Sequence, residues 1–189
     1  QLDDGQLDIH IPWGKISKFW YPLLICDIAI FLILIFWGKN QHVSIGLVQF
    51  TFWSILTGIE LGIILLLGNE NVGGKFLGIV AAITLIAALI GTYSGINFSP
   101  MGPFLFGALL FLLCGYTIRL FFGLGRNRKV AIGGAILFTL YLLYDFNRLA
   151  VLNEQPDANT WETAMDISIN IYLDIINLFL DILEAMGDS

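Results

Sequence analysis

The chain has 189 residues, of which 57% are hydrophobic and 13% are charged, and its mean hydropathy is +0.82. Soluble domains carry about 25% charged residues, so this composition excludes an ordinary soluble fold and predicts an integral membrane protein. The 15 acidic and 9 basic residues give a net charge of −6. The bases are scattered in short loops, so no basic run suggests a nucleic acid partner, and the excess of acids favours cations over anions.

Six long apolar runs recur along the chain. Each is near the length of about 20 residues that crosses a bilayer as a helix, and charges, glycines and prolines mark the loops between them. The expected spans cover residues 20–37, 43–67, 76–96, 104–122, 130–149 and 161–184. Every loop is too short to hold a core of its own. We therefore expect one transmembrane helical domain over residues 1–189, an all-α polytopic bundle in the lipid bilayer.

The basic residues are distributed unevenly between the two sets of loops. With six spans both chain ends lie on one side, and positive charges favour the cytosolic side. The loops on the side of the chain ends carry Lys15, Lys18, Lys75, Arg126, Arg128 and Lys129, whereas those on the other side carry Lys39 and Arg148. The count of positive charges thus predicts that both ends are cytosolic.

A row of polar residues interrupts the last apolar run. Its members follow one another at steps of four, four, three and four residues, which places them on one face of a helix. They are Asp166, Asn170, Asp174, Asn177 and Asp181. Such a polar stripe is costly in lipid and usually marks an ion or proton pathway.

Further acids lie within the other expected spans. Asp27 and Glu60 fall in the first two, and Asp145 falls in the fifth. Asp145 and Asp174 stand in similar local frames, Leu143–Tyr144–Asp145 and Tyr172–Leu173–Asp174, and we expect these two to act together. The alternative is that each is a satisfied buried group, hydrogen-bonded to a neighbouring tyrosine or, for Asp145, paired with Arg148.

A pair of buried carboxyl groups has two chemical properties of interest here. Two carboxylates held close in a low-dielectric site cannot both ionise cheaply, so they keep a shared proton until the pH rises. When both are ionised, they are hard oxygen ligands suited to calcium, and Asn170 and Asn177 can add carbonyl oxygens. Other sites are not indicated, because His10 and His42 lack a second metal ligand nearby and no glycine-rich phosphate loop is present. We expect no cofactor.

Two sequence motifs resemble the transmembrane Bax inhibitor motif family, the Bax inhibitor and lifeguard-like proteins. They are Tyr144–Asp145–Phe146–Asn147 and the stretch of the last helix from Ile171 to Phe179, with Tyr172–Leu173–Asp174 followed by Asn177–Leu178–Phe179. Looser matches cover Leu24–Ala29 with Phe36–Trp37 and Lys39, and Gly91–Tyr93 with Phe98 and Phe104–Leu105. The resemblance spans nearly the whole chain but begins at the second of the family's seven helices.

The resemblance implies a helix bundle around a central last helix that conducts calcium down its gradient in a pH-dependent way. It implies that Asp145 and Asp174 are the pH-sensing pair. It also implies that a basic residue at the position of Lys39 latches this pair when the pair is ionised, with Asp27 as an acid of the same helix. Family members usually begin in the cytosol, which would make the first residues here non-cytosolic, against the charge count.

The main functional hypothesis is a proton-gated calcium leak channel without covalent chemistry, in which Asp166, Asn170, Asn177, Asp181 and Glu60 line the ion pathway. Its partners would be calcium ions, protons and the bilayer, in a prokaryotic cell membrane or a eukaryotic endomembrane. A second hypothesis is a non-conducting protein that binds membrane protein partners in cell-death control. A calcium/proton exchanger and an intramembrane aspartyl protease, which also needs two facing carboxylates, are further alternatives.

Overall fold

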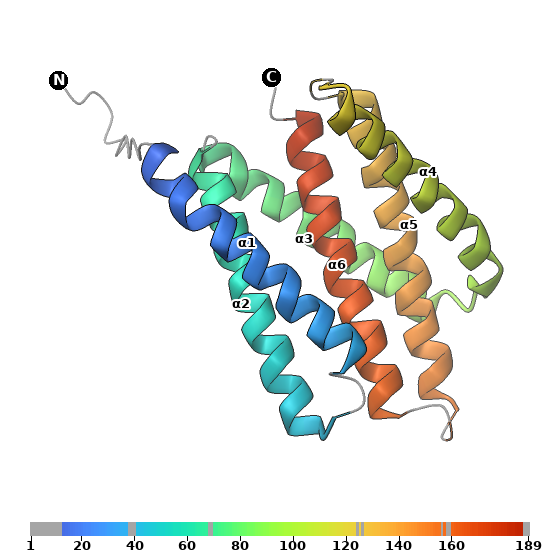
Figure 1. Cartoon of the computed structure of the whole chain (residues 1–189). Helices are drawn as coiled ribbons and strands as arrows, with labels where there is room; N and C mark the ends of the chain where they lie inside the picture. The colour runs from blue at the N-terminus through green and yellow to red at the C-terminus, as the bar shows by residue number, and fades with distance from the viewer. Residues whose placement is uncertain are drawn as a thin grey trace. The chain divides into compact units, whose positions relative to one another are not determined.

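A computed structural model describes residues 13–37, 41–67, 70–123, 125, 127–155, 157 and 160–186. Within these residues the secondary structure is entirely helical, as the composition and the apolar runs predicted (Figure 1). The elements are α1 (Trp13–Phe36), α2 (Val43–Leu67), α3 (Glu70–Tyr93), the short 3-10 helix η2 (Ser99–Met101), α4 (Gly102–Phe121), α5 (Arg128–Asn153) and α6 (Trp161–Met186). The expected all-α class is confirmed.

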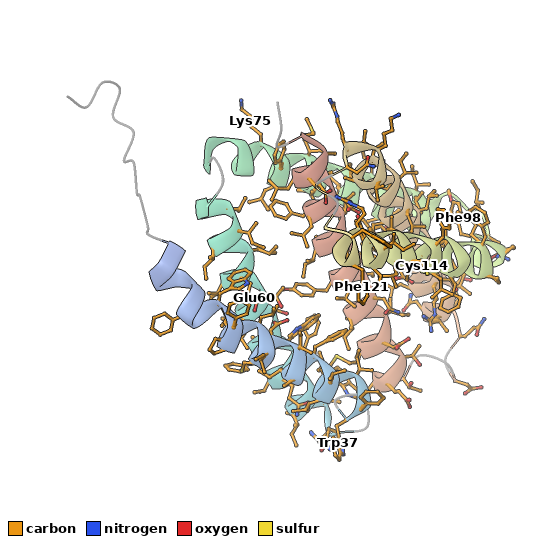
Figure 2. All side chains as sticks on the ribbon, turned by 45° about the horizontal axis from the view of Figure 1, so that its top comes forward. Trp37, Glu60, Lys75, Phe98, Cys114 and Phe121 are labelled. Atoms are coloured by element: carbon orange, nitrogen blue, oxygen red, sulfur yellow. The ribbon has the colours of Figure 1, made fainter. Side chains whose placement is uncertain are left out.

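Five of the described helices, α1 to α5, are long and apolar enough to cross a membrane. Their surfaces fit that environment, because large apolar side chains point outward along them, with Phe111 83% exposed (Figure 2). In a bilayer such side chains meet lipid, and the helices satisfy their own backbone hydrogen bonds. The chain is therefore a membrane protein with several transmembrane helices.

The sixth helix differs from the other five in its acids. α6 has 26 residues, long enough to span, but it carries Glu162, Asp166, Asp174, Asp181 and Glu184. These acids lower its hydropathy, and it is not among the helices that length and composition select. Its transmembrane position stays a prediction from its apolar run.

The chain divides into two compact units, one up to Glu70 and the other from Asn71. In the first unit α1 and α2 form an antiparallel hairpin (Figure 1). Phe31 of α1 stacks on Trp53 of α2 with ring centroids 5.1 Å apart, and Leu34 is buried. Aromatic stacking and apolar packing thus join the two helices. The expectation of a single domain over residues 1–189 stays a prediction.

In the second unit α5 and α6 run antiparallel, side by side, and α4 packs against α5 (Figure 1). Leu142 of α5 and Leu178 of α6 are fully buried. The short connection after α5 returns the chain at once, which makes the two consecutive helices neighbours. The motifs around Asp145 and Asp174 therefore lie on adjacent helices.

The junction between α3 and α4 is fixed to α5 by Asn147. Its side-chain amide donates to the carbonyl oxygens of Gly91 at 3.0 Å and Ile96 at 2.9 Å, and its Oδ1 accepts from the Phe98 N–H at 3.0 Å. Gly91 itself lies against Leu143 and Phe146 of α5. We call Asn147, Gly91, Ile96 and Phe98 the α3–α5 clamp. α3 ends at Tyr93, three residues before the expected end of the span at Ile96, and Gly95 follows it with a φ of 68°.

Candidate ion and proton site

The polar stripe of α6 is only partly buried. Asp174 is 6% exposed and Asp181 is 5% exposed, whereas Asp166, Asn170 and Asn177 are half-buried. The residues of the stripe therefore differ in burial. Its two buried carboxyl groups lie seven residues apart, which is two helical turns or about 10.5 Å along the axis.

Asp145 of α5 and Asp174 of α6 meet in the structure. Their carboxyl groups are close enough to interact with each other, and Asp145 is 3% exposed. Two buried carboxyl groups this close cannot both ionise cheaply, which favours one shared proton. That this pair shares a proton and senses pH stays a prediction.

Other groups lie close to this pair. Tyr141, one turn before Asp145 on α5, is near enough to both carboxyl groups to interact with them electrostatically. The positive charge of Arg148, three residues after Asp145, also acts on it. Asp174 Oδ2 has no hydrogen-bond partner among the described residues. The pair thus retains a buried oxygen whose hydrogen-bonding capacity is unused.

Arg148 forms its ion pair elsewhere. Its Nη2 lies 3.4 Å from Asp166 Oδ2, and both side chains are more than one third exposed. The alternative in which Arg148 neutralises Asp145 directly is therefore replaced by a surface pair between α5 and α6. A pair this exposed contributes little stability, about 0–1 kcal/mol. Within the described residues neither Asn170 nor Asn177 hydrogen-bonds to the carboxyl pair.

The second buried acid of α6 binds a tyrosine that the sequence reading did not single out. Tyr116 of α4 donates its hydroxyl to Asp181 Oδ1 at 2.5 Å. Oδ2 of the same carboxyl group has no hydrogen-bond partner among the described residues and lies against Gly134 of α5. A side chain at position 134 would occupy the space of this carboxyl group.

Arg119 and Glu184 join the ends of α4 and α6 close to Asp181. Arg119 Nη2 lies 3.0 Å from Glu184 Oε1 and donates to the Gly125 carbonyl oxygen at 2.7 Å. The Asn127 N–H donates to Glu184 Oε1 at 3.1 Å. We call this set, Arg119, Glu184, Gly125 and Asn127, the terminal clasp, because it ties α6 to the turn between α4 and α5.

The remaining candidate residues belong to the first unit. Thr57 of α2 donates its hydroxyl to Asp27 Oδ1 at 2.9 Å, and Glu60 is close enough to Asp27 for their charges to repel. Asp27 thus has partners within the α1–α2 hairpin. Lys39 lies outside the described residues, so the latch by Lys39 and Asp27, and the place of Glu60 in an ion pathway, stay predictions.

The described residues hold no cluster of three or more His, Cys, Asp or Glu side chains that could bind a metal ion. Asp145 and Asp174 by themselves offer two carboxyl groups. High-affinity calcium sites use six to eight oxygen ligands. The expectation that calcium contacts Asp145 and Asp174 stays a prediction.

Comparison with known proteins places the chain. Residues 7–189 match the family described as "Inhibitor of apoptosis-promoting Bax1". The chain belongs to this family. The resemblance expected from the motifs on α5 and α6 is thus confirmed, and these Bax inhibitor motifs are the segments that bring Asp145 and Asp174 together.

The relatives of this Bax inhibitor family chain occur in plants and bacteria. It is 29% identical to Protein LIFEGUARD 4 of Arabidopsis thaliana over 87% of this chain and 65% of that protein. It is 33% identical to Protein LIFEGUARD 1 of the same plant over 58% of this chain and 47% of the relative. An uncharacterized protein of Helicobacter pylori is 27% identical over 91% of this chain and 73% of the relative. The chain thus spans less than two thirds of the length of the two Arabidopsis relatives.

Proposed function

We propose that this Bax inhibitor family chain forms the proton-sensing part of a calcium leak pathway. The observation that carries the proposal is the close approach of two buried carboxyl groups, Asp145 of α5 and Asp174 of α6. A proton shared between them joins the two helices, so the contact between α5 and α6 depends on pH at this point. A cation channel needs such a site to bind an ion weakly enough to release it, and two carboxyl groups without a third acidic ligand meet that need.

The direction of the pH effect follows from the charge of the pair. With one shared proton the pair carries a single negative charge, and without it the pair carries two. The doubly charged form attracts a passing calcium ion more strongly, which slows its release from the site. Proton uptake weakens that attraction. Calcium flux should therefore rise as the pH falls.

The test is calcium entry into dye-loaded liposomes that contain the full chain, measured from acid to mildly alkaline pH. The calcium flux of the wild type should change about tenfold or more across the titration of the pair. This corresponds to a difference of about 1.4 kcal/mol between the open pathway's stability with and without the shared proton. Asp145→Asn and Asp174→Asn should each remove this pH dependence, because a single carboxyl group has no partner with which to share a proton.

A matched control is Glu162→Gln in the first turn of the same helix, which removes an exposed acid that is not part of the pair. It should keep the pH dependence of the wild type. The proposal fails if the folded wild type shows no calcium flux at any pH, or if both variants of the pair retain its pH response.

The description of the family favours a second candidate, a non-conducting membrane protein that acts through partners in cell-death control. The polar stripe of α6 would then bind a partner helix through interhelical hydrogen bonds. Absence of flux together with loss of partner binding on changing the half-buried Asn170 and Asn177 would support this candidate over the channel.

A further inference from the structure

Asp181 sits in a buried contact of three helices within the second unit. It projects from α6, its Oδ1 accepts the hydroxyl of Tyr116 from α4, and its Oδ2 lies against Gly134 of α5. Neither neighbour is charged. An ionised carboxylate buried among neutral groups is costly unless a cation compensates it.

The charged groups that face this contact do not provide that compensation. From α4 comes Arg119, whose guanidinium lies 5.8 Å from the centre of the Tyr116 ring. Its Nη2 is engaged by Glu184, one turn after Asp181 on α6, and by the Gly125 carbonyl. From α5 the charged residues at this end are Arg128 and Lys129, and both are exposed.

The cluster therefore holds two acids, Asp181 and Glu184, and one cation, Arg119. Glu184 has both the Arg119 charge and the Asn127 N–H, so Asp181 is the acid left without an ionic partner. A neutral carboxyl group with one unmade hydrogen bond costs less than a buried carboxylate without a cation. A proton on Asp181 makes the cluster of Asp181, Glu184 and Arg119 electrically neutral.

We propose that Asp181, held by Tyr116 in the space that Gly134 leaves open, is a second proton-binding site that controls the terminal clasp. The site is separate from the Asp145–Asp174 pair, two helical turns away, and does not depend on calcium conduction. The site binds a single proton. Binding and release of this proton change the connection between α6 and the turn that joins α4 to α5.

Loss of the proton changes the partner of Arg119. Ionised Asp181 lies one turn from Glu184 on the same face of α6, and its hydrogen-bond donor Tyr116 carries Arg119 above its ring. The Arg119 Nε has no hydrogen-bond partner among the described residues, so the guanidinium has a donor to offer. Ionised Asp181 then competes with Glu184 for the Arg119 guanidinium. When the guanidinium turns towards Asp181, its Nη2 moves away from the Gly125 carbonyl oxygen and that hydrogen bond is lost.

The experiment is an infrared pH titration of the full chain in lipid nanodiscs, following the carbonyl stretching band of protonated carboxyl groups. The wild type should show one more titrating carboxyl group than Asp181→Asn. Tyr116→Phe should keep that group and shift its midpoint upward by about one pH unit, because it removes a hydrogen bond that stabilises the ionised form. Asp174→Asn should leave the Asp181 component in place.

A second readout follows the clasp itself. Amide hydrogen exchange in a peptide containing Gly125 and Asn127 should speed up in the wild type above the Asp181 midpoint by more than the base catalysis of exchange explains. Asp181→Asn should stay slow, and Glu184→Gln should be fast at every pH. The proposal is overturned if the wild type and Asp181→Asn show the same infrared titration. It is also overturned if amide exchange around Gly125 and Asn127 is the same in the wild type and Asp181→Asn at every pH. Neither outcome affects the calcium flux test.

Discussion

Replacing Gly91 with valine should destabilise the folded chain by about 3 kcal/mol or more. A Cβ at this position would lie 2.7 Å from the Leu143 carbonyl oxygen, 2.9 Å from Phe146 Cβ and 3.1 Å from the Asn147 backbone nitrogen. All three atoms belong to the backbone of α5 or stand directly on it. They cannot rotate away, so α3 and α5 must separate, and the α3–α5 clamp must stretch with them.

The measurement is thermal unfolding of the full chain in detergent, compared with Gly78→Val on the same helix. Gly78 has no neighbouring atom within 4 Å of the added Cβ, so that variant carries the same change in helix propensity without the overlap. It should lose less than about 1 kcal/mol. Equal melting temperatures for the two variants would show that the close approach of α3 to α5 is not required for the fold.

The helical class was predictable because length and hydrophobicity of a membrane helix are local properties of the sequence. α2, α4 and α5 lie close to where the apolar runs placed them. α1 and α3 begin earlier, at Trp13 and Glu70 where Trp20 and Phe76 were expected, and α3 ends at Tyr93. Its end has a local signal, because Gly95 follows two residues later with a φ of 68°, as is typical of a helix C-terminus. The hydrogen bond from Asn147 to the Gly91 carbonyl oxygen comes from more than fifty residues away, and no local pattern encodes it.

The meeting of Asp145 and Asp174 followed from the two motifs and not from composition. Whether two acids on neighbouring helices touch depends on the rotation of each helix about its axis. The family resemblance of the two motifs implied that these two acids face each other, and the structure brings them close together.

The Asp181 site was predicted only in part. The stripe placed Asp181 on the same face as Asp174, but its partners Tyr116 and Gly134 come from two other helices. A weak signal was present, since Tyr116 and Arg119 are three residues apart and so share one face of an otherwise apolar helix. Asp166 of the same stripe lies in a surface pair with Arg148, and its place in an ion pathway stays a prediction.

Replacing Asn147 with leucine should cost about 3 kcal/mol, because it leaves three backbone groups without their partner at nearly constant side-chain volume. These are the Phe98 N–H and the carbonyl oxygens of Gly91 and Ile96. Asn147 is buried, so water cannot take over all three bonds. The measurement is again thermal unfolding in detergent.

The matched control is Asn153→Leu, at the exposed last residue of α5, which should change stability by less than about 0.5 kcal/mol. Asn147 lies two residues after Asp145, about 200° further around α5, so the clamp and the carboxyl pair occupy opposite sides of one helix. The clamp therefore fixes the rotation that turns Asp145 towards Asp174. If Asn147→Leu melts like the wild type, the clamp does not hold α5. If it is destabilised and also loses the pH response of calcium flux at a temperature where it remains folded, the clamp positions the pair as well as the junction.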